Sequence, residues 1–94
     1  MDSNGYNPSL MPTAYCLLCG RGGDLVRHEV FHGSRRSRSK EYGCWVTLCP
    51  ACHAKVHAHP KINEGLEKLM QSKAMEEHEW TEEDFRVVFG KSYL

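Results

Sequence analysis

The sequence lacks any long hydrophobic run. A helix needs about 20 consecutive apolar residues to cross a bilayer, and no segment of the 94 residues approaches that length. Residues 1–12, MDSNGYNPSLMP, also lack the basic start and apolar stretch of a secretory signal. We therefore expect an unsecreted, cytoplasmic protein that has no membrane partner.

Cysteine occurs in an odd number, so the five cysteines cannot all pair within the chain. Four of them form two C-x-x-C pairs, Cys16 with Cys19 and Cys49 with Cys52, a spacing typical of metal ligands. A reducing compartment keeps thiols free for a metal, which disfavours a disulfide framework. A core this small often needs a disulfide or a bound metal to become stable. The pairs predict one structural zinc, because four thiolates leave no position for water or substrate.

Neither sign of charge dominates, because 12 Lys and Arg residues balance 12 Asp and Glu residues. The two signs are separated along the chain, with an acidic block at 76–84 and a basic cluster in a Ser- and Gly-rich segment. The cluster contains Arg27, Arg35, Arg36, Arg38 and Lys40. Lys and Arg displace counterions from a nucleic-acid backbone, so these residues predict phosphate contacts. A solvated, mobile loop is the alternative interpretation.

The apolar pattern predicts a β-hairpin in the first half of the chain. Branched apolar residues at 24–31 and at 42–48 are typical of strands. The polar residues 33–41 between them predict a loop. The zinc pairs flank this hairpin, so the ion would hold its base.

Helices are predicted in the second half. Pro50 suits the first turn of a short helix, which Pro60 then interrupts. Apolar residues at helical spacing between 62 and 70 predict a second helix that lies on the core. A capping pattern at 81–84 begins a third helix, which Gly90 stops.

These elements divide the chain into three parts. Residues 1–14 are expected to form a flexible lead, residues 15–60 a zinc-stabilised domain, and residues 61–94 a helical extension that packs on it. The expected fold class is small α+β.

Several histidines form a second group of candidate metal ligands or bases. His53 and His57 are four residues apart on the predicted helix, so their imidazoles point the same way and can bind a divalent ion. A pair of surface or zinc-flanking histidines would have the same spacing. His28 lies on the first strand, which packs across this helix, and offers a third ligand or a general base. His32 shares its face on a regular strand and either assists or packs.

The run from Cys16 to His57 resembles the zinc-bearing branch of the HNH nucleases. The resemblance rests on C-x-x-C, RHEVF and LCPACHAKVH, and it is most specific in C-x-x-C-H-x-x-x-H. The tail WTEEDFRVVFGKSYL is also similar to the end of small HNH-like proteins of phages and prophages. The resemblance implies a treble-clef-like ββα-metal fold in a bacterial or phage-infected cell, with other phage proteins as further partners.

The same resemblance implies an endonuclease that hydrolyses phosphodiester bonds of DNA. It makes His53 and His57 ligands of a catalytic Mg²⁺, Mn²⁺, Ni²⁺ or Zn²⁺ ion and places the base in the His28-Glu29 pair. We favour His28, because a neutral imidazole accepts a proton near pH 7 whereas an ordinary Glu is a weak base. Glu29 remains the alternative base, or a ligand. Arg35, Arg36, Arg38 and Lys40 would hold the DNA backbone beside the cut.

One position departs from the family pattern. Cys44 stands where the family usually has an Asn, which puts the efficiency of the site in doubt and leaves a spare thiol that suits a buried position. Two other functions compete with the nuclease. A non-catalytic zinc module would bind DNA or a protein, and a zinc hydrolase of small molecules would need a pocket-forming segment that is not evident here.

Overall fold

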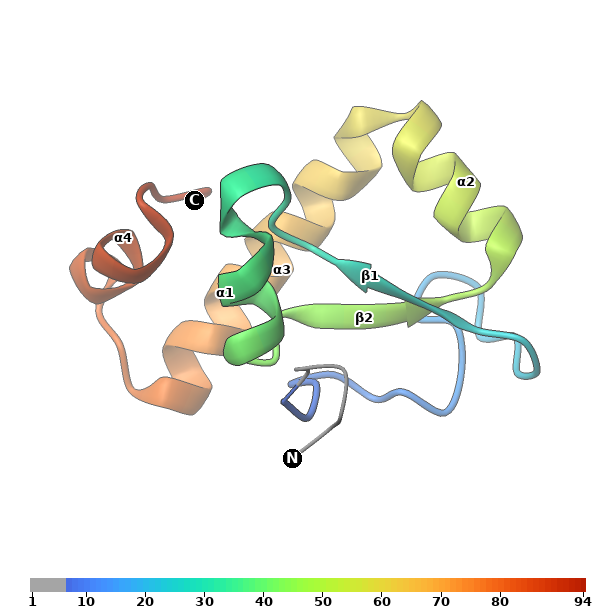
Figure 1. The fold of residues 1–94 in the computed structure, drawn as a ribbon, viewed down its shortest axis with the longest axis horizontal. Helices are drawn as coiled ribbons and strands as arrows, with labels where there is room; N and C mark the ends of the chain where they lie inside the picture. Colours follow the sequence, from blue (N-terminus) through green and yellow to red (C-terminus); the bar gives the residue numbers. More distant parts are fainter. Residues whose placement is uncertain (1–6) are drawn as a thin grey trace.

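The computed structural model describes residues 7–94 as a hairpin surrounded by helices (Figure 1). The elements, in chain order, are β1 (Val26–Glu29), the 3₁₀ helix η1 (Gly33–Arg35), α1 (Arg36–Glu41), β2 (Trp45–Leu48), α2 (Pro50–Ala58), α3 (Pro60–His78) and α4 (Glu82–Phe89). The two strands form one antiparallel sheet. The prediction of a small α+β fold with a hairpin and later helices is therefore confirmed.

The hairpin is short and its second strand is buried along its whole length. β1 and β2 pair from Val26 opposite Leu48 to Glu29 opposite Trp45. Segments before β1 bond to β2, since Leu17 donates its backbone N–H to the Thr47 carbonyl at 3.0 Å. This contact covers backbone groups that an exposed strand would present to other chains.

The expected flexible lead falls partly outside the described residues, since 1–6 are not among them. Residues 7–14 are irregular but bonded to the folded body: the Leu10 N–H donates to the Gly43 carbonyl at 3.0 Å. Gly43 has a φ of 74°, and a Cβ there would lie 2.4 Å from the Pro8 carbonyl oxygen. Only glycine suits this crossing, because any side chain would collide with the backbone of the lead.

The prediction of a polar loop at 33–41 is wrong, because this segment forms η1 and α1. Ser39 explains the error. It is fully buried, accepts a hydrogen bond from the Phe31 N–H at 3.1 Å and donates one to the Phe31 carbonyl at 3.0 Å. Its hydroxyl thereby satisfies the backbone just after β1 and anchors α1 there. The second strand accordingly begins at Trp45 rather than at residue 42.

The residues predicted to begin and end the helices do so in the structure, except that α3 is longer than expected. α2 ends at Ala58 and α3 begins at Pro60, where the missing N–H of proline costs nothing. α3 continues to His78, beyond the expected 62–70. At α4, the side chain of Thr81 and that of Asp84 each accept the other's backbone N–H, which is a capping box.

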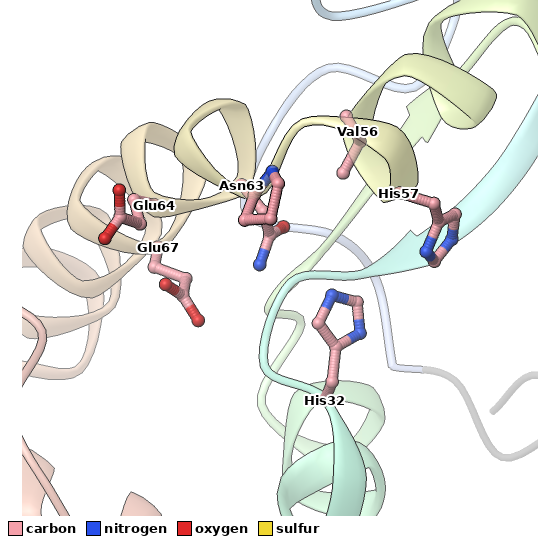
Figure 2. Close-up of a pocket in the computed structure, with 7 residues that line it drawn as sticks. His32, Val56, His57, Asn63, Glu64 and Glu67 are labelled. Carbon is pink, nitrogen blue, oxygen red and sulfur yellow. The ribbon is translucent and has the colours of Figure 1, made fainter.

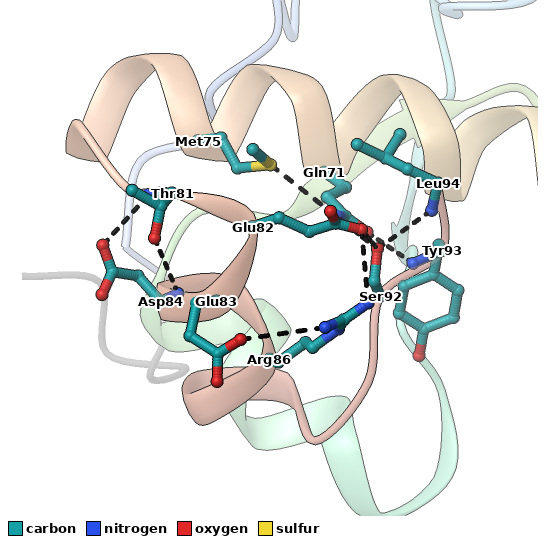
Figure 3. Close-up of polar contacts among 10 residues, drawn as sticks. All are labelled: Gln71, Met75, Thr81, Glu82, Glu83, Asp84, Arg86, Ser92, Tyr93 and Leu94. Carbon is teal, nitrogen blue, oxygen red and sulfur yellow. Dashed lines mark hydrogen bonds and ion pairs between the residues drawn. The ribbon is translucent and has the colours of Figure 1, made fainter.

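The core lies between the hairpin and the helices. Phe31 packs against Phe85 and Phe89 of α4, with ring centroids 5.5 and 4.7 Å apart. The tail is also fastened to α3 (Figure 3): buried Gln71 donates to the Ser92 hydroxyl at 3.0 Å and accepts the Tyr93 N–H at 2.6 Å. Among the helices of residues 7–94, none is both long and apolar enough to cross a membrane.

Candidate metal centres

The four paired cysteines meet at one point near the base of the hairpin. Their sulfur atoms all lie within 4.8 Å of one another, and the Cys19 and Cys49 sulfurs are 3.7 Å apart. Two sulfurs bound to one tetrahedral zinc at about 2.3 Å would be roughly 3.8 Å apart. The donors therefore fit a single zinc ion of the structural, all-thiolate type.

Local backbone structure brings these thiols together. Cys16 and Cys19 lie on a tight turn closed by the Gly20 N–H, which donates to the Cys16 carbonyl at 2.8 Å, and Gly20 has a φ of 80°. Cys49 is the N-cap of α2, and its sulfur accepts the Cys52 N–H at 3.4 Å. The positive end of the helix dipole therefore faces these sulfurs.

Cys16, Cys49 and Cys52 differ in acidity. Burial raises the pKa of Cys16, but backbone hydrogen bonds from Cys49, Cys19 and Leu18 outweigh it and bring that pKa down to about 6. The Cys52 N–H lowers the pKa of Cys49, whereas the hydrogen bond that Cys52 itself shares with Cys49 raises the pKa of Cys52 to about 12. A thiol close to thiolates keeps its proton until a cation replaces it.

A second cluster joins β1 to α2. His28 comes from β1, and His53 and His57 come from α2; one ring nitrogen of each lies within 4.8 Å of the others. The Nε2 atoms of His53 and His57 are 3.1 Å apart. Nitrogens that share a tetrahedral ion at about 2.0–2.1 Å would be roughly 3.3 Å apart. The residue types and spacing fit one divalent ion.

The histidine cluster extends from the buried interior to the surface. His28 is 1% exposed, His53 is half-buried and His57 is exposed. Burial lowers the pKa of His28, the hydrogen bond to the Asn63 oxygen opposes this effect, and neighbouring imidazoles lower the pKa further. Burial likewise lowers the pKa of His53. Neutral imidazoles keep a lone pair, which both a metal ligand and a base require.

Two cavities adjoin this cluster. The first has a volume of about 370 Å³ and is lined by Arg27, His28, Glu29, His32, Gly33, Arg36, His53 and His57. The second, about 320 Å³, is lined by His32, Val56, His57, Pro60, Asn63, Glu64 and Glu67 (Figure 2). His32 and His57 line both, and the His32 ring centroid is 4.9 Å from that of His28. His32 therefore lies beside the histidine cluster, between the first cavity, which Arg27 and Arg36 line, and the second, which Glu64 and Glu67 line.

An ion pair lies beside the first cavity. Glu29, whose side chain is 10% exposed, accepts a hydrogen bond from Arg36 Nε at 2.8 Å, and Arg36 is 64% exposed. The guanidinium of Arg27 lies over the Trp45 ring at 5.2 Å. The pair therefore holds a cationic group at the cavity, next to the imidazoles.

Of the four basic residues expected to contact phosphate, Arg36 lines the first cavity. Arg35 donates from Nε to the Phe89 carbonyl and lies against Gly90 at the end of α4. Arg38 pairs with Glu41 at 3.4 Å on the surface of α1. Within residues 7–94, Arg35, Arg38 and Lys40 line neither of the two cavities, whereas Arg36 lines the first. Arg27 joins Arg36 there.

Two further residues complete the site description. Cys44 is fully buried, burial raises its pKa to about 12, and among the described residues it belongs to neither metal-ligand cluster. Asn63, which the sequence reasoning did not single out, places its Oδ1 atom 2.9 Å from Nε2 of His28, where it can accept a hydrogen bond. A buried Asn on the apolar side of a predicted helix is the signal that could have identified it.

No protein-family model matches the chain, and comparisons with curated proteins and with solved structures also found no match. The resemblance to HNH nucleases therefore remains a prediction. The function has to be inferred from the two clusters and from the cavities beside them.

Proposed function

We propose that this protein is a metal-dependent HNH-type endonuclease that hydrolyses phosphodiester bonds of DNA. The observation that carries the proposal is the convergence of His28, His53 and His57 beside the 370 Å³ cavity, apart from the four cysteines. A zinc module that only binds a partner has no need for a second cluster with an open side. The hairpin followed by α2 supports a treble-clef-like ββα-metal unit, with a structural zinc on the cysteines.

Each imidazole then has a role. His53 and His57 would hold the catalytic Mg²⁺, Mn²⁺, Ni²⁺ or Zn²⁺ ion. Such an ion supplies Lewis-acid stabilisation of the negative charge that grows on the scissile phosphate. His28 accepts a proton from the attacking water, because burial keeps its imidazole neutral.

Glu29 is the weaker candidate for the base. Its carboxylate accepts a hydrogen bond from Arg36 Nε at 2.8 Å, so this oxygen is already engaged in an ion pair. Glu29 instead holds Arg36 at the cavity, where Arg36 and Arg27 can contact phosphates on either side of the cut. Contacts of this kind position the backbone and read little sequence.

Supercoiled plasmid provides the test. Zinc-loaded protein is incubated with plasmid and Mg²⁺, Mn²⁺, Ni²⁺, Zn²⁺ or no added ion, and nicking is measured on agarose gels. We expect ion-dependent nicking that falls at least about 100-fold in His28→Ala, the lower end of general-base contributions. His28→Gln, which leaves a smaller cavity, guards against loss by unfolding.

Metal binding separates the roles. Titration calorimetry should show that His53→Ala and His57→Ala lose the second ion, while His28→Ala retains it. His59→Ala is the matched control, because His59 is exposed at the end of α2 and lies outside the cluster. If His28→Ala also loses the ion, His28 is a ligand and Glu29 becomes the base. A parent that cleaves with none of the ions would contradict the nuclease and favour a binding module.

A further inference from the structure

Asn63 connects the first turn of α3 with the histidine cluster. It is 9% exposed, and its Oδ1 atom lies 2.9 Å from Nε2 of His28. Its other end, Nδ2, donates to the Val30 carbonyl at 3.4 Å. Figure 2 shows the side chain pointing from α3 toward the turn after β1. Asn63 therefore bridges the backbone of this turn and the imidazole.

The two contacts together determine which way the amide points. If the amide were flipped, its oxygen would face the Val30 carbonyl oxygen, and two acceptors would meet without a proton between them. The carbonyl end must therefore face His28, and an oxygen acceptor requires an N–H on Nε2 of that ring. A neutral imidazole with its proton on Nε2 has its lone pair on Nδ1.

We propose that Asn63 is a positioning residue that fixes His28 in the Nε2–H tautomer and in its ring orientation. This inference rests on the proposed function for its catalytic meaning, since Nδ1 is then the nitrogen that takes the proton of water.

Because Asn63 is buried, its amide needs both of its hydrogen bonds. An amide withdrawn from water is stable only where its donor and acceptor are both bonded, and Asn63 meets this requirement through Val30 and His28. The orientation of an imidazole by a neighbouring hydrogen-bond acceptor commonly affects metal affinity or activity by about 10- to 100-fold. A leucine of similar size at position 63 would fill the same space without orienting the ring.

The tautomer can be read without any cleavage. Nitrogen-15 NMR of the histidine rings distinguishes a protonated nitrogen from a bare one in the zinc-loaded protein at neutral pH. In the parent, His28 should show the proton on Nε2. In Asn63→Leu this preference should be lost and cleavage should fall about 10- to 100-fold, with KM for DNA unchanged. Asn63→Asp keeps an acceptor toward His28 but loses the donor to the Val30 carbonyl, so it should lower stability and still keep a proton on Nε2.

Gln71→Leu provides the matched control, since Gln71 is also a buried amide on α3 but bonds to the C-terminal tail. It should lower stability and leave the His28 tautomer as it is. A parent with the proton on Nδ1, or an Asn63→Leu variant that keeps the Nε2–H form, would overturn the proposal. Because these spectra need no substrate, failure of the parent to cut DNA refutes the nuclease alone, and the tautomer still decides the role of Asn63.

Discussion

A comparison of two cysteines tests whether a metal holds this fold. Cys19 is exposed and belongs to the four-thiol cluster, whereas Cys44 is fully buried and belongs to neither cluster of the described residues. If burial alone set their importance, alanine at position 44 would be the more damaging change. If zinc holds the fold, alanine at position 19 is worse, because it removes one of four ligands.

The magnitudes separate the two outcomes. Structural zinc contributes about 10–16 kcal/mol in small zinc domains, so loss of one ligand in four costs on the order of 3 kcal/mol. A domain of this size unfolds with a free energy of roughly 5–10 kcal/mol. At about 4–8 °C per kcal/mol, Cys19→Ala should lower Tm by well over 10 °C. Cys44→Ala removes only a buried sulfur and should cost about 1 kcal/mol.

The assay combines metal analysis with thermal unfolding followed by circular dichroism. The parent and Cys44→Ala should each carry tightly bound zinc and should melt at much lower temperature after treatment with a strong chelator. Cys19→Ala should melt between the parent and the chelated parent, and chelator should lower its melting temperature further, because three thiolates remain to hold the ion. Equal melting temperatures for the two variants, a parent without bound metal, or native disulfides in mass spectra would refute the reasoning.

Three further outcomes follow from the contacts. Arg36→Ala should weaken DNA binding and flatten its salt dependence more than Arg38→Ala, since only Arg36 lines the cavity; equal effects in a salt titration would contradict this. Ser39→Ala should lower the free energy of unfolding by about 1–3 kcal/mol, because Phe31 backbone groups lose their partner; chemical denaturation measures it. Cys44 should resist iodoacetamide until the protein unfolds, because burial raises its pKa to about 12. Mass spectrometry should detect no adduct at Cys44 in the native protein, and an adduct there would contradict this prediction.

Short-range patterns predicted much of this molecule. The spacing of Cys16 and Cys19, the place of Pro60, and the Thr81–Asp84 capping box all act within a few residues, so the sequence displays them directly. The spacing of His53 and His57 works in the same way, because one helical turn brings their rings together.

Long-range contacts account for what was missed. α1 depends on Ser39 reaching the backbone of Phe31, and a polar composition conceals such a partner. Arg35 bonds to Phe89, 54 positions away, so its charge serves the attachment of α4 rather than the cavity. Asn63 lies 35 positions from His28, and their meeting depends on how α3 docks against β1. Composition and periodicity carry no information on such distances.

The first turn of α2 serves both clusters at once. Cys49 and Cys52 face the thiol cluster, and the next residue, His53, belongs to the imidazole cluster. Neighbouring positions on a helix differ by about a quarter turn or slightly more, so one backbone segment presents two unlike ligand sets to two different places. We therefore expect the ions to load in a fixed order. Zinc would bind first and order the turn, and only then would His53 and His57 lie close enough to His28 to bind a second ion. Depletion of zinc would therefore prevent ion binding at the imidazole cluster even though none of the imidazoles is a zinc ligand of the first site.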